Sequence, residues 1–427
     1  MKKLLLILLC LPMIGFGQYT YVPDDNFEAY LEANTMGDGV ANNDYVFTFG
    51  IGSISMVTLL DVSSENISDL TGIEDFSALT ELILEGNQLT SLDVSQNTAL
   101  TTLSCQLNQL TSLDVSQNTA LTFLHCEFNQ LTSLNVSGAT ALEDLFCNHN
   151  QLTSLDVSQN PALTNLHCND IQLTSLDVSN NLALTVLACH YNQLTSLDVS
   201  QNPALSSLLC DNNQITSLNV SGATALEYLD CGVNQLTSLD VSNNIALTEL
   251  VCGYNQLTSL DLSNNISLGE LDCNNNQLTS LDVSQNTNLW SLECQSNLLE
   301  CLNISNNPDL TEVNFQSNLL EQLNLKNGNW SILDPNALSN NLTCVEVDNI
   351  GYATNNWATG FDGFVAFSTN CNYTNPCNTN TAIQEHTTNK KLLKVTDLLG
   401  RETKGTKNEI LFYIYEDGTV EKRMVIE

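Results

Sequence analysis

Ten cysteines recur at intervals of 21 residues from Cys105 to Cys294, and this spacing constrains the fold more than any other feature. They belong to a repeated unit, L-T-x-L-x-C-x-x-N-Q-L-T-S-L-D-V-S-x-N-x-A, which runs from about Leu79 to Leu325. A unit this short cannot bury a hydrophobic face alone, so such repeats stack and share one continuous core. The sequence therefore predicts a solenoid.

Each unit predicts two short strands. Leu103 and Cys105 alternate with other residues, and Leu113 and Val115 do the same later in the unit. This alternation is typical of a strand that is buried on one face. Turns rich in asparagine and serine separate the two strands, which gives a flattened coil.

The repeat resembles the leucine-rich repeat, whose signature L-x-x-L-x-L-x-x-N-x-L appears as LTTLSCQLNQL and LTVLACHYNQL. Its second half, LTSLDVSQNTAL, nearly matches the same signature, as in the nested bacterial class of this family. The resemblance implies a mainly β repeat solenoid with parallel strands on one or both faces. A short N-terminal helical cap, a C-terminal cap and a small β sorting domain complete the expected fold.

The repeated cysteines could be core filler, disulfides or metal ligands. Leu84 and Phe315 occupy the same register in flanking units, so the position accepts apolar residues, and cysteine behaves there as a small hydrophobe. Adjacent coils place equivalent atoms about 4.8 Å apart, whereas a disulfide needs Cβ atoms about 3.8 Å apart. A line of thiols also offers zinc no tetrahedral set. We favour core filler and expect no metal there.

Four further cysteines follow the repeated ones, and they call for a different interpretation. Cys344 and Cys371 lie beyond the repeats, and we expect them to form a disulfide that closes the C-terminal cap in an oxidising compartment. The sequence leaves open whether Cys301 and Cys377 pair.

A column of asparagines follows the cysteines and predicts a structural ladder. A side-chain amide can donate to and accept from the turn backbone of neighbouring coils. Ile171 interrupts the column, and we expect a local bend there. The column consists of Asn87, Asn108, Asn129, Asn150, Asn192, Asn213, Asn234, Asn255, Asn276, Asn297 and Asn318.

The residues that vary between repeats flank the cysteine, and alternation points them outward. Histidines and aromatics gather there with acidic residues, which favours a recognition surface for a protein or glycan ligand. A solvated face that drifted after repeat duplication is the alternative. The predicted ligand-binding residues are His125, Phe128, Phe146, His149, His167, His190, Tyr191, Tyr228 and Tyr254. His125 and His167 lie two coils apart, too far for one zinc ion.

The second strand of each unit carries a column of aspartates. Neighbouring carboxylates repel and attract cations, so calcium is a hypothesis here, against loosely held counterions and hydrogen bonds to Ser and Thr. Asp38, Asn43 and Asp44 form a second calcium candidate whose spacing matches a calcium loop poorly. The column consists of Asp93, Asp114, Asp156, Asp177, Asp198, Asp240, Asp261 and Asp282, with Asn135, Asn219 and Asn303 at every fourth coil.

Charge and motifs exclude several function classes. The net charge is −37, and residues 19–325 hold 36 acidic residues and no lysine or arginine. Such a surface repels nucleic acid and anionic lipid. There is no G-x-S-x-G, H-E-x-x-H or P-loop motif, and the carboxylates stand in uniform columns, so the chain is not expected to be an enzyme.

The two ends of the chain predict export. MKKLLLILLCLPMIGFGQ has the lysines, apolar stretch and small residues of a signal peptide, and we expect no transmembrane segment in the mature chain that follows. Downstream, Asp24 and Asp25 are candidate caps of a helix that carries Phe27 and Leu31 and ends near Gly37.

The final segment resembles the C-terminal sorting domain of the Bacteroidetes type IX secretion system. The resemblance lies in DLLGRE, YIYEDG and the terminal KRMVIE, and ILFYIYEDGTVEKRMVIE predicts a β-hairpin with Asp417 and Gly418 in its turn. It implies that the secretion machinery is a partner and that the protein is secreted or held at the cell surface after crossing the outer membrane.

The expected organisation has six segments. They are a signal peptide (1–18), an N-terminal cap (19–56), the solenoid (57–325), a C-terminal cap (326–371), a linker (372–389) and the sorting domain (390–427). The sequence thus predicts an exported, non-enzymatic binding or adhesion protein. The alternative is an acidic rod that acts as a structural spacer and binds cations.

Overall fold

The computed structural model describes residues 19–49, 53–331, 333–363, 365–373, 377, 392–396, 410–415 and 420–424. The predicted signal peptide, most of the predicted linker and the predicted turn at Asp417 and Gly418 lie outside these residues. The chain divides into two compact units, residues 1–377 and 378–427. In the part of the chain that the structure describes, no helix is long and apolar enough to cross a membrane.

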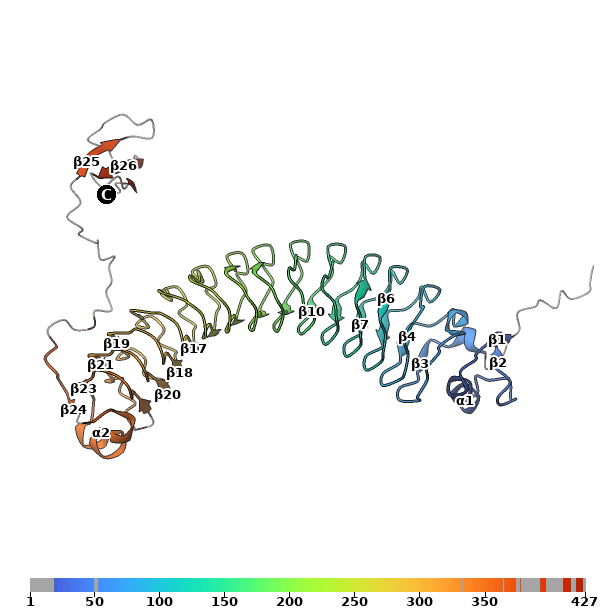
Figure 1. Cartoon of the computed structure of the whole chain (residues 1–427), viewed down its shortest axis with the longest axis horizontal. Coiled ribbons are helices and arrows are strands. Elements are labelled where there is room, and N and C mark those ends of the chain that lie inside the picture. The colour runs from blue at the N-terminus through green and yellow to red at the C-terminus, as the bar shows by residue number, and fades with distance from the viewer. Residues whose placement is uncertain are drawn as a thin grey trace, which may run out of the picture. The chain divides into compact units, whose positions relative to one another are not determined.

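Parallel strands of successive coils form one sheet of fourteen strands, the long sheet, along the first unit. Figure 1 shows the coils stacked in an arc, with strands of the long sheet along its inner side. The predicted solenoid is therefore confirmed. The strands are β3 (Leu59–Asp61), β4 (Glu81–Ile83), β5 (Thr102–Ser104), β7 (Phe123–His125), β9 (Asp144–Phe146), β10 (Asn165–His167), β11 (Val186–Ala188), β13 (Ser207–Leu209), β15 (Tyr228–Asp230), β16 (Glu249–Val251), β17 (Glu270–Asp272), β18 (Ser291–Glu293), β20 (Glu312–Asn314) and β22 (Asp334–Asn336).

The outer side of the coils is less regular than the two strands per unit that we expected. Leu155 and Val157 are buried there, yet in many coils this segment forms no strand. Coils fan apart on the outer side of an arc, so ladder hydrogen bonds form only in places (Figure 1). The strands that do form are β6 (Ser112–Asp114) with β8 (Ser133–Asn135), β12 (Ser196–Asp198) with β14 (Ser217–Asn219), and β19 (Cys301–Asn303), β21 (Gln322–Asn324), β23 (Cys344–Glu346) and β24 (Ala366–Ser368).

The ten repeated cysteines are free and fully buried, which confirms that they fill the core. Burial raises the pKa of each thiol, to about 12 at Cys147 and Cys189. Cys126 Sγ lies 3.4 Å from the carbonyl oxygen of Phe146 and can donate to it. Thiols held protonated in an apolar core are poor nucleophiles and poor metal ligands.

The asparagine ladder joins each coil to its neighbours. Asn129 Nδ2 donates to the carbonyl oxygens of Cys105 (2.9 Å) and Cys126 (3.2 Å), and its Oδ1 accepts from Leu110 N (2.9 Å). This pattern satisfies buried backbone groups of two coils at once. It recurs at Asn87, Asn108, Asn150, Asn192, Asn213, Asn234, Asn255, Asn276, Asn297, Asn318 and Asn340.

The backbone changes where Ile171 interrupts this ladder. Asp170 has the positive φ of its column (56°), and Gln172 also has a positive φ (72°). Elsewhere the equivalent glutamine donates its backbone N–H to the preceding coil, as Gln193 N does to Leu173 O at 2.8 Å. Among the described backbone hydrogen bonds none runs from Gln172 N to Leu152 O, so one bond between coils is missing beside Ile171. The local bend that we expected there stays a prediction.

A second asparagine ladder, which the sequence analysis did not identify, lies across the core from the first. Asn118 is fully buried, and its Nδ2 donates to the carbonyl oxygens of Val94 (2.9 Å) and Asn97 (3.0 Å). Ala139 and Ala223 take this position in two coils. The ladder consists of Asn97, Asn118, Asn160, Asn181, Asn202, Asn244, Asn265, Asn286 and Asn307.

A helical cap covers the first coil. Helix α1 (Asp25–Ala33) begins at Asp24, whose Oδ1 accepts from Asn26 N and Phe27 N at 3.0 Å and whose Oδ2 accepts from Ser68 N at 2.8 Å. Phe27 is buried and stacks on Phe76 at 6.2 Å. One carboxylate therefore caps the helix and ties it to the solenoid. The cap also contains β1 (Tyr19–Tyr21), antiparallel to β2 (Tyr45–Phe47), and a short 3-10 turn at Ile54–Met56. A second 3-10 turn, at Ile73–Asp75, lies in the first coil between β3 and β4.

Helix α1 ends earlier than the Gly37 that the sequence suggested. Its cap residue is Asn34, and Thr35 takes a left-handed φ of 63°. Met36 N then donates to Leu31 O (2.9 Å) and Thr35 N to Glu32 O (3.3 Å). This pair of bonds is the Schellman arrangement, which here stops the helix without a glycine.

The C-terminal end of the solenoid is closed by α2 (Ile350–Asn356), a 3-10 turn (Ala358–Gly360) and two disulfides. Parallel pairing continues through β22, β23 and β24, inside the segment that we expected to be a cap. Disulfides join Cys344 to Cys371 and Cys301 to Cys377, with Cα atoms 5.9 and 5.7 Å apart. The sequence had left the second pair open.

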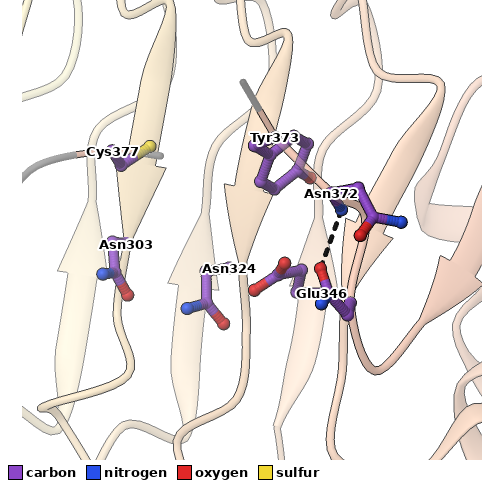
Figure 2. Close-up of a pocket in the computed structure, with 7 residues that line it drawn as sticks. Asn303, Asn324, Glu346, Asn372, Tyr373 and Cys377 are labelled. Carbon is purple, nitrogen blue, oxygen red and sulfur yellow. Dashed lines mark hydrogen bonds between the residues drawn. The ribbon is translucent and has the colours of Figure 1, made fainter. Parts of the chain in front are cut away.

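Under the disulfide-bonded segment lies a pocket of about 370 Å³ (Figure 2). Asn303, Asn324 and Glu346 line it from neighbouring strands. The Tyr373 hydroxyl donates to Cys344 O at 2.8 Å, and Cys371 N donates to Glu346 Oε1 at 3.1 Å. These hydrogen bonds fasten residues 371–373 to the outer side of the solenoid.

The described residues of the second unit form three antiparallel strands, β25 (Leu392–Thr396), β26 (Ile410–Tyr415) and β27 (Val420–Met424). The pairing of β26 with β27 confirms the predicted hairpin.

The asparagine ladder predicts a stability effect. We expect Asn255→Ala to lower the free energy of unfolding by about 2 kcal/mol or more, because buried carbonyls and Leu236 N lose their partner. Asn264→Ala should change it by less than about 0.5 kcal/mol, because that exposed side chain makes one bond, to Ser242 O. Chemical denaturation measures the free energy of unfolding of both variants. Equal losses of stability would contradict a stabilising role of the asparagine ladder.

Burial of the repeated cysteines predicts that their thiols do not react with thiol reagents in the folded protein. In the native protein we expect the ten repeated cysteines to resist a water-soluble disulfide reagent, and after denaturation all ten should react. Rapid labelling of the folded protein would contradict the buried arrangement. The disulfide cysteines provide the internal control, since they react only after reduction.

Candidate ligand-binding face

The long sheet presents two outward columns of side chains. In β7 the middle residue, Leu124, is fully buried, whereas Phe123 and His125 on either side are partly exposed. Strands pair in register, so equivalent residues of successive coils lie beside one another. The turn that follows each strand adds exposed side chains along one edge of the sheet. These positions form the candidate site.

Four side chains of β7, β9 and β10 form an aromatic–histidine cluster: Phe123, His125, Phe146 and His167. The ring centroid of His125 lies 4.3 Å from those of Phe123 and Phe146, and Phe146 stacks on His167 at 4.5 Å. Three of the four residues were predicted from the sequence, and Phe123 was not. The first residue of each strand points outward like the third, and applying alternation to both would have found it.

Burial lowers the pKa of His167, and the neighbouring His190 and His125 lower it further, against an opposing effect of Asp144. His167 is therefore neutral at neutral pH. His125 Nδ1 lies 3.7 Å from Glu127 Oε1. A neutral ring can stack on aromatic or apolar partner groups without losing the hydration of a charge.

The turns that follow the strands of the long sheet carry Phe128, His149, Tyr191 and Tyr254, of which Tyr254 follows β16, four coils beyond β10. Phe128 stacks on His149 at 4.3 Å, and His149 Nδ1 lies 2.8 Å from Asp170 Oδ2. Tyr191 and Tyr254 are each 58% exposed. All four residues have φ between 51° and 55°, a conformation that the coil geometry imposes at this position.

His190 borders the aromatic–histidine cluster at His167, whereas Tyr228 lies several coils beyond it. The ring of His190 lies 5.6 Å from that of Tyr191, edge on. Tyr228 lies in β15, where burial and then the negative charges of Asp230 and Glu249 raise its pKa to about 12. The predicted residues therefore lie on one face, but the structure distributes them over several coils.

Beyond the aromatic–histidine cluster the same face becomes an acidic zone, composed of Asp230, Glu249, Glu270, Asp272 and Glu293. Burial raises the pKa of every one of these carboxyls, and at Asp230, where it reaches about 6, Asp211, Asp272 and Glu249 add to the effect. The sequence showed acidic residues among the varied positions, but their separation into a zone of their own is visible only in the structure.

The aspartates of the outer side behave differently. Asp93 Oδ1 accepts from Ser95 N at 2.9 Å, and bonds from Ser95 lower the pKa of Asp93. Asp177 and Asp261 accept from Ser179 and Ser263 in the same way. Each carboxylate thus stabilises the turn that follows it, and that local bond gives the column a structural role.

Metal-ligand geometry appears elsewhere, in the N-terminal cap. Within the described residues, Asp25, Glu28 and Asp44 bring carboxylate oxygens within 4.8 Å of one another. Asp44 belongs to the second calcium candidate of the sequence, whereas Asp38 accepts a hydrogen bond from Asn43 Nδ2 at 3.0 Å.

Comparison with known proteins places this geometry in context. No protein-family model matches the chain. Internalin J of Listeria monocytogenes is 37% identical over 78 residues, which is 18% of this chain but only 8% of the length of Internalin J. The matching sequence therefore spans a small part of that relative.

Solved structures match far more of the chain. A leucine-rich-repeat protein of Leptospira interrogans is 26% identical, with a TM-score of 0.59 over 68% of this chain and 86% of its own. A second Listeria monocytogenes internalin, 21% identical, shares the fold with a TM-score of 0.57 over 83% of this chain and 96% of its own.

The functional domain of Internalin J from Listeria monocytogenes, which includes a cysteine ladder, is 35% identical to this chain. The similarity covers 80% of both chains with a TM-score of 0.63. The chain therefore belongs to the internalin-like leucine-rich-repeat proteins.

Proposed function

We propose that the exposed face of the long sheet binds a protein ligand. One observation carries the proposal: the outward columns differ from coil to coil, while the cysteine, leucine and asparagine positions repeat. A scaffold that keeps its core and varies one face presents a surface suited to recognition. Stacked aromatic rings on that face supply the rigid contact groups that are common at protein interfaces.

The turn residues support the same proposal. Glycine or asparagine fits a left-handed position with little strain, as at Gly86 and Asn275 of this column. Phe128, Tyr191 and Tyr254 occupy it at a cost of about 1 kcal/mol each, and their side chains are exposed. Bulky aromatics there contribute nothing to the core, which favours a role in binding.

The acidic zone indicates the charge of the ligand. Its carboxyls lie close together without a lysine or arginine anywhere in residues 19–325. Repulsion between these carboxylates destabilises the free protein, and a cationic partner surface that covers them reduces this repulsion. We therefore expect a ligand with a basic patch opposite the acidic zone and an apolar patch opposite the aromatic–histidine cluster.

We also propose that the protein works outside the cell. The apolar start of the chain favours export, and the C-terminal segment favours sorting by type IX secretion, with release or surface attachment after the outer membrane. The disulfides at the end of the solenoid fit an oxidising compartment. The regular aspartate column of the outer side favours the rival function, an acidic spacer without a specific ligand.

Binding to an array of extracellular proteins and polysaccharides tests the proposal. We expect a protein ligand whose affinity falls at least about tenfold when Phe128, Tyr191 and Tyr254 are changed together to alanine, and falls with added salt. The matched control changes Leu182, Ile245 and Ile266 to alanine, since these apolar residues are equally exposed at other turns.

Loss of binding in both triple variants would contradict a site on the sheet face. Binding of polysaccharide alone would replace the protein ligand by a glycan. No binding at all by a correctly folded protein would favour the spacer.

The raised pKa of Asp230 predicts how stability depends on pH. Its folded pKa of about 6 exceeds the reference value of 3.8, so the folded state holds the proton more tightly and stability falls as pH rises between these values. We expect Asp230→Asn to stabilise the protein by about 1 kcal/mol near neutral pH, after allowance for solvent screening, and by nothing below about pH 4.

Asp261→Asn is the control in the same thermal unfolding series. The bonds from Ser263 lower the pKa of Asp261, so this change should give no gain at neutral pH. If Asp230→Asn stabilised the protein by the same amount at every pH, the stabilisation would not come from removing the charge of Asp230.

A further inference from the structure

Three carboxylates converge in the N-terminal cap, away from the ligand-binding face. Asp25 and Glu28 lie in the first turn of α1, and Asp44 immediately precedes β2. One oxygen of each lies within 4.8 Å of the others. The chain thus brings together acidic groups from a helix and from a loop that are 16 residues or more apart in sequence.

The decisive side chain is Glu28, which is only 1% exposed. Its Oε1 accepts from Asn43 N at 3.0 Å, whereas its Oε2 is buried and has no hydrogen-bond partner in the described structure. A buried carboxylate is strongly unfavourable unless it is paired, protonated or bound to a metal. Residues 19–325 contain no lysine or arginine to pair with it, and the nearby Asp25 and Asp44 add negative charge.

Oxygen atoms in this arrangement match the ligands of a hard divalent cation. Calcium takes oxygen ligands at about 2.3–2.6 Å, so opposite ligands around one ion stand about 4.6–5.2 Å apart. Oxygens that all lie within 4.8 Å of one another can therefore contact a single calcium ion. Magnesium demands ligands at about 2.0–2.1 Å in near-ideal octahedral geometry, which three carboxylates on a helix and a loop suit less well.

We propose that Asp25, Glu28 and Asp44 bind one calcium ion in the N-terminal cap. The ion takes Glu28 Oε2 as a ligand and offsets the charge of all three carboxylates, and water completes its coordination. It thereby links α1 to the loop that leads into β2. Because α1 covers the first coil through Phe27, calcium stabilises the cap against fraying from the end of the solenoid.

Calorimetric titration of the purified, calcium-stripped full-length protein with calcium chloride tests this site. We expect one saturable site in moderate salt, and we expect Glu28→Gln to weaken it at least about tenfold, since the amide keeps the size of the side chain but loses its charge. Asp25→Asn, a change at an exposed position, should weaken it too. Asp261→Asn removes the same charge on the outer side of the coils and should leave calcium affinity unchanged.

Thermal unfolding provides the second measurement. Calcium should raise the melting temperature of the wild-type protein and of Asp261→Asn, and should have little effect on Glu28→Gln. Circular dichroism checks that each variant is folded. If Glu28→Gln does not fold, Asp25→Asn takes its place in both measurements. Magnesium chloride at equal concentration should give a smaller shift.

Three results would overturn the proposal. The first is wild-type protein that binds no calcium. The second is calcium affinity that is equal in Glu28→Gln and wild type. The third is weak binding of many ions that salt abolishes, the behaviour of a diffuse counterion atmosphere.

Discussion

Satisfaction of backbone hydrogen bonds between coils is the constraint on which the rest of this structure depends. A flattened coil turns its backbone into the core at both edges, where water cannot reach the carbonyl groups. Asn129 and Asn118 represent the two ladders that supply donors there, one at each edge. Each asparagine side chain donates a hydrogen bond to a carbonyl group of the preceding coil. Equivalent asparagines must therefore occupy the same place in successive coils, which requires the constant spacing of 21 residues.

Because the asparagine ladders hold the coils together, the outward side chains of the long sheet are not needed for the stability of the fold. Leucines and cysteines fill the core, and the asparagines hold the coils, so the outward residues of β7 to β18 can change without loss of fold. The chemical character of these outward residues changes along the sheet. Aromatic rings and histidines gather on β7, β9 and β10, whereas carboxylates with raised pKa values gather from β15 to β18. A single face thus offers two chemically different contact areas.

Negative charge is managed differently in different parts of the solenoid. On the outer side, Asp93 and its equivalents accept hydrogen bonds from serine two residues later, which favours the ionised form. On the sheet face, burial opposes ionisation at Asp230. In the cap, Glu28 is nearly excluded from solvent with one oxygen unpartnered. Since residues 19–325 contain no lysine or arginine, neither Asp230 nor Glu28 has a lysine or arginine of the solenoid or of its N-terminal cap to pair with.

The sequence by itself determined the solenoid, the burial of the cysteines and the first asparagine ladder, because all three follow from strict periodicity. It also indicated most of the aromatic–histidine cluster by alternation. Only the tertiary structure decided which outer segments pair, since that depends on the curvature of the stack. The same holds for the disulfide of Cys301 with Cys377 and the meeting of Glu28 with Asp44, because these contacts join chain segments that no repeat relates.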